Sequence, residues 1–80
     1  MTSKIITLKK ALDTRQAALF VQTASKFKSI IKISVGDINV NAKSLMCIIS
    51  LGLSDGKQAT IIAEGEDENS AVEEVTAVLL

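Results

Sequence analysis

Residues 44–52 read Ser-Leu-Met-Cys-Ile-Ile-Ser-Leu-Gly, a small hydroxyl residue followed by an almost wholly apolar run that a glycine ends. Serine is a favoured N-cap because its oxygen accepts a hydrogen bond from a backbone N–H group of the first turn, and glycine suits the left-handed residue that often follows the last turn. We predict a short helix over 44–51 capped by Ser44. Such a helix buries only one face, and exposed apolar surface is typical of a binding site. We expect exposure at Leu45, Met46 and Ile49, and burial at Ile48 and Leu51.

Periodicity predicts the elements around this helix. Alternating apolar residues indicate strands, and apolar residues at intervals of three and four indicate helices. The strands are expected at 5–8, 31–35, 38–40 and 58–64, and the other helices at 15–27 and after 67. Asp13 or Thr14 is expected to cap the first helix and Asp67 the last. The lysine pair 9–10 is predicted to carry the chain into solvent, and residues 54–56 to form a turn.

The resulting order is β-α-β-β-α-β-α. It predicts an α+β fold of two layers, in which helices cover one face of a four-stranded antiparallel sheet. With 80 residues and no linker-like segment, we expect one domain over 1–80. No apolar run approaches the roughly 20 residues of a membrane helix and the first residues do not resemble a signal peptide, so we expect a cytoplasmic protein with no membrane contact.

The composition excludes several kinds of chemistry. The chain has no histidine, which is the usual general base, transition-metal ligand and phospho-accepting imidazole. Cys47 is the only cysteine, so neither an internal disulfide nor a cysteine-cluster metal site is expected. We therefore expect no enzyme activity, no metal and no cofactor. Basic residues gather in 1–43 and acidic residues in 44–80. This uneven charge either orients a binding partner or stabilises the fold by attraction between two solvated faces.

Three segments resemble the HPr phosphocarrier proteins of the bacterial sugar phosphotransferase system. Residues 41–52 are similar to the regulatory-serine segment of that family, and residues 17–27 and 61–68 continue the resemblance at the family's separations. The resemblance covers nearly the whole chain. It implies the open-faced β-sandwich of HPr proteins, which matches the order of elements predicted above.

The family's phosphorylated histidine is missing. HPr proteins carry Gly-Ile-His-Ala-Arg-Pro where residues 11–16 here read Ala-Leu-Asp-Thr-Arg-Gln, so Asp13 stands at the histidine position and Arg15 is retained. Without an imidazole, sugar phosphocarrier activity is not expected. Asp13 is either a helix cap or a weak imitation of the phosphohistidine charge. Arg15 is either an exposed charge or, as in the family, a group that meets phosphates and partner carboxylates.

The resemblance also implies partners. Ser44 matches the serine that HPr kinase/phosphorylase of Gram-positive bacteria modifies, and a chain with this serine but no histidine resembles the Crh-like group of catabolite-repression proteins. Such a protein is expected to act as corepressor of a LacI-type catabolite control regulator, with no direct contact to nucleic acid. Cys47 stands where the family usually has glycine. A homodimer is among the expected partners. The family's docking residues match Arg15, Phe20, Leu45, Met46 and Ile49. The alternative is a phosphorylation-independent interaction module in which Asp13 is a fixed acidic residue.

Overall fold

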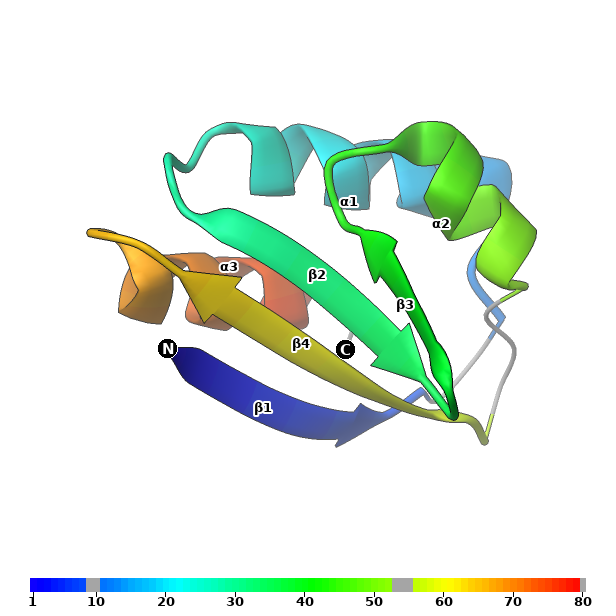
Figure 1. Ribbon diagram of the computed structural model, residues 1–80. Helices are drawn as coiled ribbons and strands as arrows, with labels where there is room; N and C mark the ends of the chain where they lie inside the picture. Colours follow the sequence, from blue (N-terminus) through cyan, green and yellow to red (C-terminus); the bar gives the residue numbers. More distant parts are fainter. Residues whose placement is uncertain (9–10, 53–55, 80) are drawn as a thin grey trace.

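Alternating apolar residues along four segments form the four strands of a single sheet. The computed structural model describes residues 1–8, 11–52 and 56–79. The elements are, in chain order, β1 (Thr2–Thr7), α1 (Thr14–Ser25), β2 (Ile30–Val35), β3 (Ile38–Asn41), α2 (Leu45–Leu51), β4 (Gln58–Glu64) and α3 (Glu68–Leu79). The strand order is β1-β4-β2-β3, with every neighbouring pair antiparallel. The helices lie on one side of the sheet (Figure 1). The predicted two-layer α+β fold is confirmed.

The elements begin and end close to the predicted residues. The strand over 58–64 and the end of the short helix at Leu51 are as predicted, and the first strand begins earlier, at Thr2. Helix α1 ends at Ser25 and not at 27. The next two N–H groups donate to carbonyls three residues back instead of four. That of Lys26 donates to the Thr23 carbonyl at 3.2 Å, and that of Phe27 to the Ala24 carbonyl at 3.3 Å. The lysine pair 9–10 and most of the turn predicted at 54–56 lie outside the described residues.

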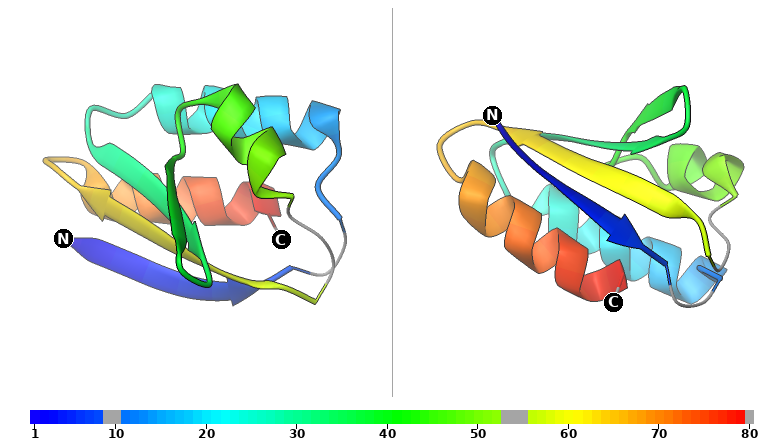
Figure 2. Two further views of the ribbon diagram at one scale, coloured as in Figure 1. Left: turned by 45° about the vertical axis from the view of Figure 1, so that its right-hand side comes forward. Right: turned by 90° about the horizontal axis from the view of Figure 1, so that it is seen from below.

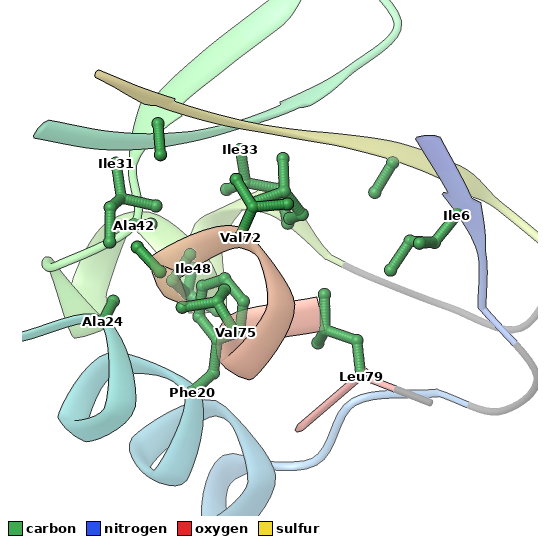
Figure 3. Close-up of a cluster of buried hydrophobic side chains, with 14 of the residues drawn as sticks. Ile6, Phe20, Ala24, Ile31, Ile33, Ala42, Ile48, Val72, Val75 and Leu79 are labelled. Atoms are coloured by element: carbon green, nitrogen blue, oxygen red, sulfur yellow. The ribbon is translucent and has the colours of Figure 1, made fainter. Parts of the chain in front are cut away.

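The core lies between the sheet and the helices and is aliphatic except for one ring. Phe20 of α1 points into it, against side chains from α2, α3 and the sheet (Figure 3). Its labelled neighbours include Ile48 of α2 and Val75 of α3. Thr76 is also buried, and its hydroxyl has no hydrogen-bond partner among the residues that the structure describes. The helices are therefore held over the sheet mainly by apolar contact, and α3 itself carries the unsatisfied Thr76 hydroxyl.

Asp67 joins the start of α3 to the segment that follows α1. Its carboxylate accepts hydrogen bonds from the backbone N–H of Lys28 at 2.9 Å and of Ser29 at 3.0 Å, and from the Ser29 hydroxyl. These hydrogen bonds hold the pKa of Asp67 below its usual value, and the bond from the Ser29 hydroxyl has the largest effect. We predicted that this side chain caps α3, and that prediction is wrong. The helix does begin after Asp67, whose backbone carbonyl accepts from Ala71 N at 2.9 Å, but the side chain bonds another segment.

Gly65 allows this close approach. Its φ is +153°, and a Cβ atom there would lie 2.7 Å from the Ser29 Oγ and 2.8 Å from the Ser29 Cα. Any side chain would force apart the two segments that Asp67 joins. The turn between β4 and α3 is therefore fixed against the end of α1.

Candidate functional site

Ser44 caps α2 as predicted. Its backbone is extended (φ −110°, ψ 115°), and its Oγ accepts a hydrogen bond from the Cys47 N–H at 3.4 Å. At the other end, Gly52 takes the left-handed conformation (φ 65°), and its N–H donates to the Ile49 carbonyl at 3.2 Å. Ser44 is half-buried. The hydroxyl thus lies at the positive end of a short helix, partly accessible to solvent.

The segment before Ser44 is held in place by three further bonds. The Asn41 side-chain oxygen accepts from the Lys43 N–H at 2.9 Å, and the Asn41 carbonyl accepts from the Ser44 N–H at 3.2 Å. The Lys43 ammonium donates to the carbonyl of Phe27, just beyond α1, at 2.7 Å. Ala42, between them, is buried. The turn that leads into α2 is therefore anchored both to itself and to the end of α1.

The apolar side chains of α2 divide between the core and the surface. Leu45, Met46 and Ile49 are 37%, 73% and 47% exposed, whereas Ile48 and Leu51 are buried. The expected exposure and burial of these five residues are confirmed. We call Leu45, Met46 and Ile49 the α2 patch. It adjoins Ser44, and its role in binding stays a prediction.

Phe20 does not belong to this surface. We expected it to be an apolar docking residue, but it has no exposed area, because the periodicity of α1 turns it toward the core. The neighbouring Leu19 is 52% exposed and lines a shallow hollow with Arg15, Gln16, Ala18 and Gln22. Leu19 is thus the apolar surface residue of α1 that the sequence analysis missed. Its position one residue from Phe20 in a helix was the available signal.

Asp13 and Arg15 lie at the start of α1, and both are exposed. Asp13 caps the helix as predicted, since its Oδ1 accepts from the Gln16 N–H at 2.8 Å. The first turn of α1 lies at the same end of the molecule as the last turn of α2 (Figures 1 and 2). Ser44 lies at the opposite end of α2. Among the described residues, no hydrogen bond or salt bridge joins Arg15 to Ser44.

Cys47 lines a second hollow, on the side of α2 that faces β3. Ile38 and Val40 of β3 contribute to its wall, together with Met46, Ser50 and Leu51 of α2. Ile38 is 56% exposed. Strand pairing brings these residues beside α2, so no local pattern in the sequence predicts the hollow. The α2 patch therefore continues across Met46 onto β3.

Among the described residues, the charge asymmetry of the two halves produces two direct ion pairs. Lys26 of α1 lies 3.6 Å from Glu74 of α3, and the amino group of Met1 lies 3.0 Å from Glu68. The Lys26–Glu74 pair is exposed on both sides and adds little to stability, whereas the Glu68 side chain of the other pair is only 21% exposed. Over the described part of the chain, no group of three potential metal ligands occurs. No helix among the described residues is long and apolar enough to cross a membrane.

Comparison with known proteins identifies the class. The profile described as "PTS HPr component phosphorylation site" matches residues 2–80. A structure of the phosphocarrier protein HPr from Bacillus anthracis str. Ames superposes with a TM-score of 0.93 and 40% identity, covering 99% of this chain and 96% of that one. The chain therefore belongs to the HPr family.

Within the family, the chain is similar to proteins described as HPr-like. It is 46% identical to HPr-like protein Crh of Bacillus subtilis (strain 168) over 72 residues, which cover 90% of this chain and 85% of the relative. A crystal structure of that Crh, described as an unexpected swapping domain forming a dimer, superposes with a TM-score of 0.79 and 44% identity over 92% of this chain and 85% of that one. The chain is thus an HPr-like protein similar to Crh.

Proposed function

We propose that this chain is a regulatory HPr-like protein whose Ser44 is phosphorylated by HPr kinase/phosphorylase, and that the phosphorylated form is the corepressor of a LacI-type regulator in carbon catabolite repression. The observation that carries the proposal is the α2 patch directly beside a partly accessible capping serine. The kinase and the regulator would both meet this surface. The protein would act in the cytoplasm, by protein contact, without binding nucleic acid or membrane and without catalysing a reaction.

Sequence identity does not separate a regulator from a phosphocarrier, because 40% identity to an HPr is close to 46% identity to Crh. The absence of histidine does separate them. Transfer of phosphate from the general phosphotransferase enzyme needs a nucleophilic imidazole, and the chain has none. Asp13 is not expected to replace it, because an acyl phosphate would require a metal-binding acidic pocket and no such cluster surrounds Asp13 among the described residues.

A phosphate on Ser44 is compatible with the fold. It would join a helix N-terminus, where negative charge is favoured by roughly 0.3–1 kcal/mol, so the helix would be kept. Its consequence would be on binding. Basic groups of the regulator would bind the phosphate, and Leu45, Met46 and Ile49 would provide apolar contact. Arg15, at the start of α1, would bind a carboxylate of the partner.

The experiment is to incubate the protein with HPr kinase/phosphorylase and ATP and to measure incorporation of phosphate. Ser44→Ala should remain unmodified, whereas Ser50→Ala, which changes an exposed serine of the same helix, should be modified like the wild type. Calorimetry with a LacI-type regulator at two salt concentrations should then show tighter, salt-sensitive binding of the phosphorylated form. Ser44→Asp should reproduce this poorly, since it lacks the second charge. Equal affinities of the phosphorylated and unmodified forms would contradict the corepressor function.

The second candidate function is a phosphorylation-independent interaction module. It is favoured by one observation: Asp13 presents a permanent negative charge at the start of α1, beside exposed Arg15 and Leu19. In this case Asp13→Asn should weaken partner binding, and treatment with the kinase should leave it unchanged. Homodimer formation is compatible with both candidates, as the Crh of Bacillus subtilis has been crystallised as a dimer.

A further inference from the structure

One face of the sheet is left uncovered by the helices in the described part of the chain (Figures 1 and 2). The buried residues of each strand point toward the helices, so their neighbours point to this outer face. Ile6 is buried and Ile5 is outward, Ile31 is buried and Ile30 is outward, and the pattern of β4 places Ile62 outward as well. Ile5 and Ile30 are 67% and 63% exposed.

The three outward isoleucines form a continuous diagonal. Ile5 of β1 pairs with Thr60, two residues from Ile62 on β4, and Ile62 pairs with Lys32, two residues from Ile30 on β2. Diagonal neighbours on one face of a sheet lie within side-chain reach. Ile30 and Ile62 also line one shallow groove, with Lys32 and Glu64 at its walls. We call Ile5, Ile62 and Ile30 the isoleucine stripe.

Charges flank the stripe on opposite sides. Glu64 lies on β4 beside Ile62 and pairs with Ile30 across the strands, and Lys32 lies on β2 beside Ile30 and pairs with Ile62. Two-fold rotation of a second copy about an axis along the stripe would place the two stripes over each other. The Lys32 side of one copy would then lie over the Glu64 side of the other. Lys32 of each copy would then face Glu64 of the other, twice in the dimer. Ser3 and Thr60 would exchange in the same way, so that two uncharged residues face each other there.

We propose that this outer face binds a second copy of the chain, in a symmetric dimer of two stacked sheets. The arrangement is self-complementary, as a two-fold interface requires. It does not use Ser44 or the α2 patch, so it is independent of the proposed function and leaves both sites accessible. It also differs from exchange of a strand, because each sheet keeps its own β1.

The dimer should be weak. Three strands about 4.8 Å apart and about 20 Å long present a footprint of about 300 Å² on each copy, or about 600 Å² in all, which is below the standard size of specific interfaces and fits only a weak, transient contact. The stripe advances one strand and two residues at each step, so it runs at about 35° to the strands. A two-fold axis along it therefore crosses the strands of the two copies at about 70°, near the orthogonal class of sheet packing, with the sheets about 10 Å apart. We expect a dissociation constant in the range of about 10 μM to 1 mM.

Sedimentation velocity over this concentration range tests the proposal with reversals of charge. Lys32→Glu and Glu64→Lys should each weaken association about tenfold, because each creates two like-charge contacts. The double variant should restore association to near the wild-type value. These residues are exposed, so the fold should be kept in all three, which circular dichroism would verify. Failure of the double variant to restore association would overturn the proposal.

Apolar variants test the stripe itself. Ile5→Thr and Ile30→Thr should each weaken association about tenfold, since each removes apolar contact from both halves of the interface. Ile38→Thr is the matched control, because Ile38 is similarly exposed but lines the hollow beside α2, and association should not change. A wild-type protein that is monomeric throughout the range, or a dimer unaffected by the stripe variants as strand exchange would give, would overturn the proposal.

Discussion

Phe20→Ala is expected to destabilise the fold strongly without acting on the partner surface directly. The ring has no exposed area and is packed among side chains from all three helices and the sheet (Figure 3). Replacing a buried phenylalanine by alanine costs about 3–5 kcal/mol. A domain of 80 residues has a total free energy of unfolding of about 4–12 kcal/mol. The variant should therefore lose a quarter or more of its stability, and its melting temperature should fall by at least about 12 °C.

The assay is urea unfolding followed by far-ultraviolet circular dichroism, because the chain has neither tryptophan nor tyrosine for fluorescence. The midpoint should fall while the slope stays constant. Leu19→Ala is the control, since Leu19 is exposed and its removal should change the free energy of unfolding by no more than about 0.5 kcal/mol. If Phe20→Ala costs less than about 1 kcal/mol and instead abolishes partner binding, the placement of this ring in the core is refuted.

Thr76→Val should raise the free energy of unfolding by about 1 kcal/mol, because it removes a buried hydroxyl that has no hydrogen-bond partner; a loss in urea unfolding would mean that the hydroxyl is bonded. Met46→Asp should leave the melting temperature nearly unchanged but weaken binding to a LacI-type regulator by more than about 1–2 kcal/mol; a large fall in melting temperature would place Met46 in the core. Acid should unfold the protein through Asp67 and Glu68. The Thr2 hydroxyl and the terminal amino group lower the pKa of Glu68 from its ordinary 4.5 to about 2, so this stabilisation is complete above pH 4.5 and is lost as the pH falls toward 2. The melting temperature should fall between pH 4.5 and pH 2, and the fall should be smaller for Asp67→Asn. An equal fall in the wild type and the variant would contradict the role of Asp67.

Local signals were sufficient for most of the fold. Ser44, Gly52 and Asp13 act within a few residues of their own positions, and all three cap helices as predicted. Strand alternation also gave the correct order of elements, because one face of each strand packs against the helices. The inward face of 5–8 was not assigned, as Ile5 and Ile6 are equally apolar and only pairing with β4 decides between them.

The failures arise where distant segments meet. Asp67 has the sequence context of a cap, but the backbone N–H groups of Lys28 and Ser29 lie within its reach, and three bonds from that segment compete with the first turn of α3. Phe20 was assigned to the surface from the family's docking residues, although the periodicity of α1 places it in the core. The isoleucine stripe arises only when strand pairing brings Ile5, Ile62 and Ile30 together.

The two capping residues of the candidate site differ in whether their charge can be changed by modification. Asp13 and Ser44 both accept a hydrogen bond from the N–H three residues ahead, at 2.8 Å and 3.4 Å. Asp13 is a fixed acidic residue of the sequence, so it can only act on a partner permanently. Ser44 is neutral until modified, and phosphorylation would change the local charge by about −2 beside the α2 patch. In the proposed function, regulation would therefore depend on Ser44, and in the constitutive alternative, binding would depend on Asp13, so Ser44→Ala and Asp13→Asn test the two separately.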